Sequence, residues 1–469
     1  MFDDIRRAVG GGIRKETRKR VVRASYDAAR TTDDNRRHWA NADHLSAAAA
    51  NDPATRRTLR NRARYEVANN SYARGIVSTL ANDIIGTGPR LQVIDDPEAR
   101  EIEEAFGKWS KAVGLAAKLR TMQKSRTTDG EGFGVLVRNP KVPHQVQLDV
   151  LLVEADQIAT PDLSPWSPTE VDGIKLDEYG NPVEYHMLKA HPGDALWGGR
   201  TDYDVIDPRF MIHWFRQDRP GQVRGVPDLL PALPLFAQLR RYTLACIAAA
   251  EIAADIAGVM KTNGPADDED DAPRGTPFEA VEIEKGMLLT MPDGYDVTQF
   301  RAEQPTTTYP MFKGEILNEI ARCIDMPYNV AACNSSGYNY ASGRLDHQTY
   351  YQSVRVEQSG VELVILSRIF LAWLVEYDMA RGLKRRKNAP AVQWFWDGRE
   401  HVDPAKEATA QATRLESHTT TLAQEYARKG QDWEEQLTQR SKELALMRKL
   451  GLPLGNGQNA AQQAEEPKE

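Results

Sequence analysis

Acidic residues that could do chemistry lie at the ends of strand-like stretches in the first half of the chain. Asp129 and Glu131 flank Gly130, and Glu154 follows a later apolar run. Neighbouring carboxylates can act as general acid and base, or they can hold a metal ion that activates water. An Asp-Gly pair is also an ordinary turn before a strand. The three carboxylates are therefore candidates for a metal-dependent nucleic-acid enzyme, with a plain turn as the alternative.

Other signs of catalysis are weak. His186, His191 and His213 lie in or near strand-like segments without the spacing of metal ligands. The chain contains no G-x-x-x-x-G-K-[ST] for phosphate, no G-x-S-x-G and no H-E-x-x-H. We therefore expect a protein that is not an enzyme, with no catalytic residues, no bound metal and no cofactor.

Composition and charge limit the classes of protein further. The 469 residues are 27% charged and 41% hydrophobic, which is typical of globular proteins and favours two to four domains. Residues 1–64 carry sixteen Lys/Arg and eight Asp/Glu, a surplus of +8, so a total of −7 leaves −15 for the rest. A basic arm on an acidic body favours contact with an anionic partner or a neighbouring subunit. The acidic body argues against a broad grip on nucleic acid.

The three cysteines show no paired spacing. Cys246, Cys323 and Cys333 lie in or beside apolar segments. This pattern predicts reduced core cysteines in an intracellular protein.

Two long helices form the centre of the expected fold. Prolines confine the start of the first helix, which can run from Pro234 to Gly258. It carries small residues at four-residue spacing: Ala245, Ala249, Ala253 and Ala257. This stripe would let another helix approach closely, or it reflects only the high helix propensity of alanine. The second helix ends at Pro327, and short strand-like runs with the acidic loop 267–271 lie between the two.

The remaining segments predict an α+β chain in which helices predominate. We expect helices over 59–85, after Asp96-Pro97, over 115–127, over 344–381 with a bend at Gly360, and after Asp403. Strands are expected over 132–139, 146–158, 173–188 and 204–215, in a small and mainly antiparallel sheet, and a strand or loop over 394–398. Residues 455–469 are of low complexity and are expected to be disordered.

One loop invites a functional interpretation. It spans 329–343 and contains polar and tyrosine side chains that suit sliding contact with a polymer: Asn334, Ser335, Ser336, Tyr338, Asn339 and Tyr340. Amide and hydroxyl groups can touch phosphates without reading bases. An ordinary surface connection is the alternative.

A series of strings along the chain resembles the portal proteins of tailed bacteriophages, in the lambda-like branch. The strings occur in the expected order: HWANADHLSAAAA (38–50), RARYEVANNSYARGIVSTLANDIIGTGP (62–89), RTTDGEGFGVLVRN (126–139), GIKLDEYGNPVEYH (173–186), RPGQVRGVP (219–227), YNYASGR (338–344) and HVDPAKEA (401–408). Together, in this order, the strings extend the resemblance over about 40–450.

The resemblance implies a ring of subunits, commonly twelve, with a wing, a stem, a clip and a crown. Carried over by position, the parts are 1–55 basic arm, 56–227 wing, 228–258 first stem helix, 259–306 clip, 307–327 second stem helix, 328–343 tunnel loop, 344–401 long wing helix and return, 402–454 crown and 455–469 tail. The alanine stripe would then pack the stem helices, and the tunnel loop would line the DNA channel.

The resemblance also implies partners and a location. The ring would sit at one vertex of the capsid, within the virion, after assembly in the host cytoplasm. Double-stranded DNA would pass through it without sequence specificity, and no membrane would be involved. The expected protein partners are the large terminase subunit, the major capsid and scaffold proteins, and a head-completion or neck adaptor protein. Lys261 and Lys285 in the clip are the cations expected near the DNA, and a non-portal virion scaffold is the further alternative.

Overall fold

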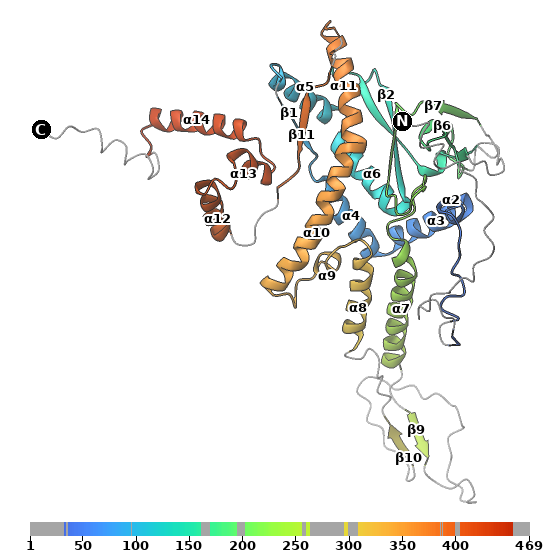
Figure 1. The fold of residues 1–469 in the computed structure, drawn as a ribbon. Coiled ribbons are helices and arrows are strands. Elements are labelled where there is room, and N and C mark those ends of the chain that lie inside the picture. The colour runs from blue at the N-terminus through green and yellow to red at the C-terminus, as the bar shows by residue number, and fades with distance from the viewer. Residues whose placement is uncertain are drawn as a thin grey trace, which may run out of the picture. The chain divides into compact units, whose positions relative to one another are not determined.

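A computed structural model describes residues 32–33, 36–94, 96–160, 169–194, 202–255, 259–262, 295–298, 308–384, 386, 388–398 and 404–453 (Figure 1). Residues 1–46 form one compact unit and residues 47–469 a second. The described part of the second unit is α+β with helices predominating, as the sequence predicts. Most of the expected basic arm lies outside the described residues.

Five helices occupy the first part of the second unit: α2 (Ala47–Ala50), α3 (Pro53–Asn69), α4 (Ser71–Ile85), α5 (Ala99–Ala112) and α6 (Leu115–Asp129). The prediction of one helix over 59–85 was wrong, because Asn70 divides it. The Asn70 side chain accepts hydrogen bonds from the backbone N–H groups of Tyr72 and Ala73 and so caps α4. The helix expected after Asp96-Pro97 is present as α5 and begins at Ala99.

The strands of this part form two antiparallel sheets rather than one. The first has the order β3-β2-β8, from Leu148–Val153, Glu131–Arg138 and Met211–Phe215. The second has the order β4-β5-β6-β7, from Glu170–Val171, Ile174–Leu176, Pro182–Leu188 and Tyr203–Ile206. The expected single strand over 204–215 is therefore two strands in different sheets, because a turn at Asp207–Phe210 separates them.

The two central helices are α7 (Leu233–Asp255) and α8 (Thr308–Arg322), which pack side by side (Figure 1). Strands β9 (Val259–Thr262) and β10 (Tyr295–Thr298) form an antiparallel pair in the segment between them. The acidic loop 267–271 lies outside the described residues. A helical hairpin with a β-structured insert is therefore present where the sequence predicts it.

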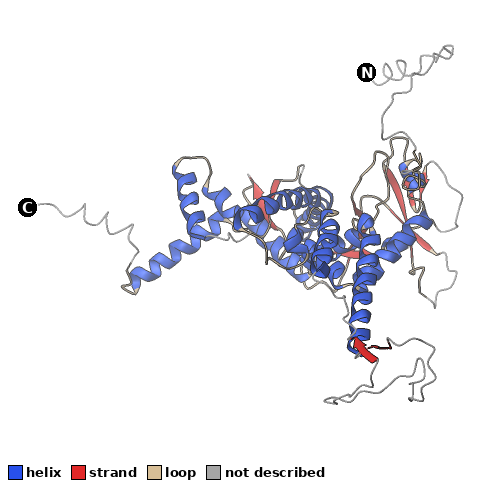
Figure 2. Cartoon of the chain, turned by 90° about the horizontal axis from the view of Figure 1, so that it is seen from below, coloured by secondary structure: helices blue, strands red, loops and turns tan. Residues whose placement is uncertain are grey.

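A long helical segment follows the hairpin. Helix α9 (Tyr328–Ala331) precedes α10 (Tyr340–Val361), the π-helical turn η5 (Glu362–Leu366) and α11 (Ser367–Ala380). The irregularity expected at Gly360 is thus a π turn directly after it, where the Gly360 backbone packs closely on Trp214. Strand β11 (Ala391–Phe395) then pairs with β1 (Arg90–Ile94), and helices α12 (Pro404–Glu416), α13 (Leu422–Arg428) and α14 (Trp433–Lys449) follow (Figure 2).

The segment Ser342–Ala380 is long and apolar enough to cross a membrane by composition alone. However, Ile365, Leu366 and Ile369 are almost completely buried within the protein's own core. As a whole, 39% of the apolar 18-residue window in this segment is buried.

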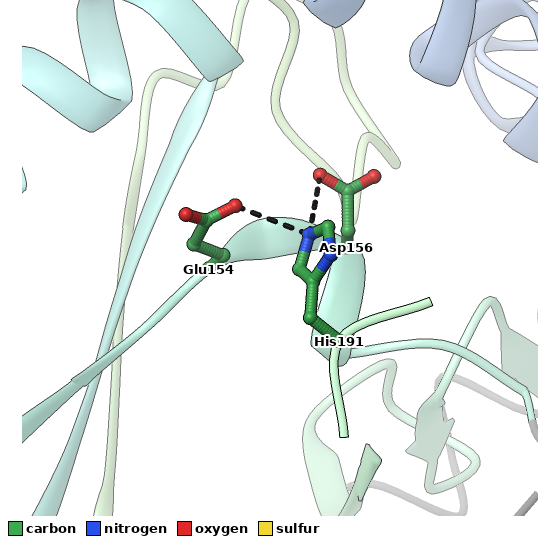
Figure 3. Close-up of side chains that lie close together, drawn as sticks. All are labelled: Glu154, Asp156 and His191. Atoms are coloured by element: carbon green, nitrogen blue, oxygen red, sulfur yellow. Dashed lines mark ion pairs between the residues drawn. The ribbon is translucent and has the colours of Figure 1, made fainter. Parts of the chain in front are cut away.

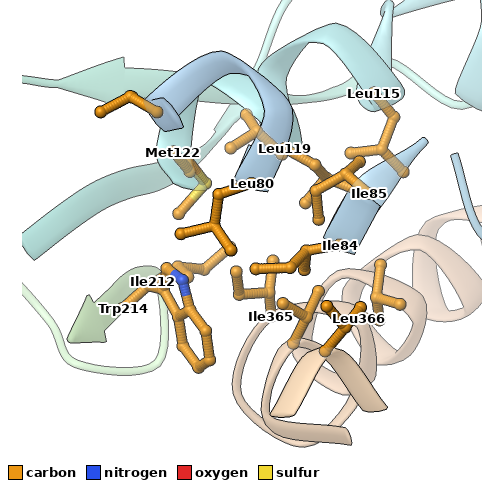
Figure 4. Close-up of a cluster of buried hydrophobic side chains, with 14 of the residues drawn as sticks. Leu80, Ile84, Ile85, Leu115, Leu119, Met122, Ile212, Trp214, Ile365 and Leu366 are labelled. Atoms are coloured by element: carbon orange, nitrogen blue, oxygen red, sulfur yellow. The ribbon is translucent and has the colours of Figure 1, made fainter. Parts of the chain in front are cut away.

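The main core joins elements that are distant in the sequence. Figure 4 shows side chains of α4, α6, β8 and η5 packed together, namely Leu80, Ile84, Ile85, Leu115, Leu119, Met122, Ile212, Trp214, Ile365 and Leu366. A second part of the same core is aromatic: the Phe106 ring lies 5.2 Å from each of the Trp109 and Trp373 rings, centroid to centroid. These contacts fix α5 and α11 against each other.

The turn between α6 and β2 requires glycine. Gly130 has φ +91°, and a Cβ there would overlap the backbone of Val226. Gly180 has a similar φ of +83° with open space around it. We predict that Gly130→Ala destabilises the protein by about 3 kcal/mol or more, through backbone strain and overlap together. Gly180→Ala should cost only about 1 kcal/mol from strain alone, so equal losses in urea denaturation would contradict the close approach.

Candidate nucleic-acid interface

The loop predicted to touch a polymer is partly helical. Its described exposed residues include Asn334, Ser335 and Ser336, while α9 and the first turn of α10 occupy its ends. The Asn334 side chain accepts a hydrogen bond from the Ser336 backbone N–H, 2.9 Å away. The exposed polar tip is therefore a short ordered turn, shorter than the flexible stretch that composition indicates.

The other three residues predicted to contact DNA lie at the end of the loop, next to or within α10. The Asn339 side chain caps α10 by accepting from the Ser342 N–H at 2.9 Å. Tyr338 is half-buried; burial and the neighbouring Asp346 raise the pKa of its hydroxyl. Tyr340 is the first residue of α10. Of the six residues proposed for DNA contact, Asn334, Ser335, Ser336 and Asn339 are exposed, and Asn339 also caps α10.

The alanine stripe is described at two of its four positions. Ala245 is exposed and Ala249 half-buried, whereas Tyr242 meets Phe312 with ring centroids 4.8 Å apart. The Ala253 side chain and Ala257 lie outside the described residues. Packing of the stripe against another helix stays a prediction.

The hairpin exposes large apolar side chains on both of its helices. Leu244 is 59% exposed, Ile247 49% and Met311 72%. A group of apolar side chains on a helical hairpin favours a surface that another chain covers.

Of the two cations expected in the clip, the structure describes only the backbone of one. Lys261 lies in β9 opposite Asp296. Lys285 lies outside the described residues, so the position of both side chains near DNA stays a prediction.

The structure reveals a buried ionic cluster where the chain enters the hairpin. Arg224 contacts Glu131 through Nη2 to Oε1 at 2.6 Å and Nε to Oε2 at 2.9 Å, and both side chains are at least 99% buried. His213 lies 3.1 Å from the same carboxylate, stacked between Phe133 and Phe215. Asp-Gly-Glu (129–131) and Arg-Gly-Val-Pro (224–227), which are far apart in the sequence, therefore meet near the base of α7.

The charges in this cluster shift one another's titration. Burial alone would raise the pKa of Glu131, but the charge of Arg224 and the hydrogen bonds from His213 and Arg224 hold it well below its ordinary value. Burial lowers the pKa of His213. The carboxylate is thus ionised and fully occupied, and it is not free to act as a base.

A second ionic cluster lies where α4, α6 and α10 meet the segments next to the hairpin. Arg126 pairs with Glu357 and lies 3.8 Å from Asp228, which is 3.5 Å from Arg216. Together with Tyr350 and other side chains they line a cavity of about 50 Å³. Burial raises the pKa of Asp228, although both arginines oppose the rise. The base of the hairpin therefore has charged groups beside its apolar packing, in which Leu229, Leu233 and Ile320 are buried.

One group of described residues could hold a metal ion by composition. Figure 3 shows His191 with its Nε2 3.2 Å from Glu154 and 3.7 Å from Asp156. The same two carboxylates already contact Arg64, at 3.3 and 2.8 Å. A cation between them would lie against this guanidinium, which repels it.

The hydrogen bond that His191 Nδ1 accepts also disfavours a metal. The Gly193 backbone N–H donates to His191 Nδ1 at 3.0 Å, so the proton of a neutral ring is on Nε2, the atom that would bind the ion. Against the effect of burial, Arg60 and Arg64 lower the pKa of Asp156. The group is an ion-pair cluster that joins α3 to the strands.

The carboxylates of the enzyme alternative are engaged in the same way. Asp129 forms a bidentate pair with Arg64, with distances of 2.7 and 2.9 Å, and Glu131 is held by Arg224. The plain-turn interpretation of Asp-Gly-Glu fits the backbone, but the partners of both acids were missed. The strings that carry the family resemblance could have drawn attention to these partners. They contain all four residues of the two pairs: Arg64, Asp129, Glu131 and Arg224.

The cysteine prediction was only partly right. All three are free; Cys246 is buried and Cys323 half-buried. Burial raises the pKa of Cys323 to about 11. Cys333 is exposed and was wrongly expected in a core, because it belongs to the polar loop rather than to the preceding apolar helix.

Comparison with known proteins now identifies the family. The family model described as "Phage portal protein, lambda family" matches residues 7–358. This chain belongs to the lambda family of phage portal proteins. It is similar to the "Probable portal protein" of Halomonas phage phiHAP-1, at 26% identity over 84% of this chain and 82% of that one. It is also similar to "Portal protein B" of Escherichia phage lambda, at 21% identity over 82% and 83%.

A solved structure titled "Neck of empty GTA particle computed with C6 symmetry" contains a chain with a TM-score of 0.46 to this portal protein. The two are 15% identical, and the match covers 78% of this chain and 92% of the other. Family membership therefore rests on the sequence comparisons, which span most of the chain.

Removal of the Glu131 charge should be costly, because it leaves Arg224 buried without its main partner. We predict that Glu131→Gln lowers the free energy of unfolding by about 3–5 kcal/mol. Glu184→Gln, in the partly exposed pair with Lys175, is the matched control and should cost less than about 1 kcal/mol. Chemical denaturation measures both; similar losses would show that the buried cluster carries no special weight.

Proposed function

We propose that copies of this portal protein close into a ring, about twelve in number, around a channel for double-stranded DNA. Membership of the lambda portal family is the observation that carries the proposal. A closed ring requires heterologous contacts that repeat around an axis. The exposed Leu244, Ile247 and Met311 on the hairpin supply an apolar surface suited to such contacts.

In this proposal the segments keep the parts given by the resemblance. Residues 56–227 and the long helix form the wing, α7 and α8 the stem, 259–306 the clip, and 402–454 the crown. The ring occupies the portal vertex of the virion after assembly in the host cytoplasm. It contacts the major capsid and scaffold proteins, takes the large terminase subunit during packaging and a neck adaptor afterwards, and conducts DNA in both directions. Portal proteins are structural components, so no catalysis is assigned.

The charge balance supports passage rather than capture. Beyond residue 64 the chain carries a net −15, and each phosphate that a channel neutralises would add affinity and friction. Ser335 and Ser336 at the tip of the loop offer uncharged hydroxyl groups. DNA would therefore meet donors that position it weakly and without sequence preference.

Native mass spectrometry with electron microscopy of the purified protein tests assembly. The expected result is a closed ring of about twelve subunits with a central hole. Leu244→Glu should break the ring, since it places a charge in the apolar contact, while Arg241→Glu on an exposed turn of the same helix serves as the control. A protein that stays monomeric even with scaffold protein and DNA present would contradict the ring.

Deletion of residues 333–340 tests the loop. Rings should still form, because the hairpin and the core are untouched, while the packaging or retention of DNA should fall. Filled and stable heads at the normal yield would show that the loop is an ordinary connection.

A further inference from the structure

The base of the loop is closed by one histidine side chain. His347, on α10, lies between Asn329 of α9 and Tyr351, one turn further along α10. Its Nε2 is 3.0 Å from the Asn329 Nδ2 and 3.2 Å from the Oδ1, and its Nδ1 is 3.1 Å from the Tyr351 hydroxyl. The imidazole thus joins the helix that enters the loop to the helix that leaves it.

The His347 contact can form with the imidazole proton on either ring nitrogen. An imidazole with its proton on Nδ1 donates to Tyr351 and accepts from the Asn329 amide nitrogen. With the proton on Nε2 it donates to the Asn329 amide oxygen and accepts from the Tyr351 hydroxyl. Both partners therefore remain bonded in either neutral form, which no aliphatic residue could reproduce.

Asn329 also organises the loop beyond this contact. Its carbonyl accepts a hydrogen bond from the Asn334 N–H at 3.0 Å. The Asn329 backbone also lowers the pKa of the Tyr338 hydroxyl, against the larger effect of burial. Asn329 therefore connects His347 with the first part of the exposed turn.

Both helices at the loop base are themselves anchored. The Tyr328 hydroxyl of α9 lies close to Gly314 of α8. The Tyr350 hydroxyl of α10 donates to Asp83 of α4 at 2.6 Å. Through His347 the loop is thus coupled to α4 and to the second hairpin helix, rather than held only by its own turns.

We propose that His347 is a positioning residue, and that the contact Asn329–His347–Tyr351 is a latch that sets where the loop 332–339 sits. The proposal rests on the proposed function only where the loop is said to face DNA. With the latch closed, the tip residues Asn334, Ser335 and Ser336 are presented in one arrangement. With it broken, the tip moves independently of α10 while the fold persists.

Hydrogen exchange by mass spectrometry on the purified full-length protein tests the latch without DNA. His347→Ala should speed exchange in peptides covering 329–339 by about tenfold, the expected effect of losing two side-chain hydrogen bonds. Peptides from α6 and α11 should be unchanged. Gln348→Ala, an exposed neighbour on the same helix, is the matched control and should leave the loop unaffected. Unchanged exchange in the His347 variant overturns the latch.

A double-mutant cycle separates a latch from general loosening. Asn329→Ala and His347→Ala should each speed loop exchange, and the double variant should be little faster than either, since both remove one shared contact. If the exchange rate of the double variant rose by the product of the two single-variant increases, the proposal would be overturned. Tyr351→Phe keeps the ring and loses only the hydroxyl, so a smaller rise is expected, and it provides a second route if His347→Ala fails to fold. No rise in this variant or in Asn329→Ala would also overturn the latch.

Packaging assays with these variants distinguish the two proposals. A loosened loop with impaired DNA retention supports both the latch and the role of the loop. A loosened loop with normal packaging and retention supports the latch and counts against the loop as a DNA contact.

Discussion

The buried contact between Arg224 and Glu131 is the constraint on which the base of the hairpin depends. Both groups are at least 99% buried, so neither charge can be left without the other. Glu131 opens β2 directly after the glycine that ends α6, and Arg224 precedes the first hairpin helix. We infer that the pair sets where α7 starts relative to the sheet. His213 and the Gly225 backbone N–H share one carboxylate oxygen of Glu131 with Arg224 Nε.

Further charged clusters lie around this position. Arg126, Asp228 and Glu357 link α6, the hairpin base and α10, while Arg64 joins α3 to Asp129. Buried ion pairs are a costly way to gain stability, and their desolvation can cancel the attraction. Their geometric demands are strict, however, and we infer that they fix the direction in which the hairpin leaves the sheet-bearing body.

The hairpin and the loop contrast with this tightly paired base. Leu244 and Met311 are largely exposed, and the loop presents uncharged polar groups at its tip. Apolar exposure on helices suits contact with another copy, and a weakly polar tip suits contact with a moving polyanion. In a portal protein, one rigid base would thus position two surfaces with different partners.

The amino-acid sequence by itself determined the order and type of most elements. Periodicity located α7, α8 and the long α10–α11 segment, and the ordered strings identified the portal family. Periodicity gave wrong boundaries where a side-chain cap or a turn interrupted the pattern. Asn70 divided one expected helix by capping α4, and the turn at Asp207 split one expected strand. These are short-range effects, and closer attention to capping and turn residues would have found them.

Tertiary structure alone decided the long-range pairings. Glu131 and Arg224 are ninety-three positions apart, and nothing in their spacing shows that they meet. They come together because β2, which Glu131 opens, pairs with β8, the strand that precedes Arg224. The same holds for Asn329 and His347, whose contact depends on how α9 turns back onto α10. Sequence periodicity reports which face of an element is apolar, whereas the choice of partner depends on packing and electrostatics across the whole fold.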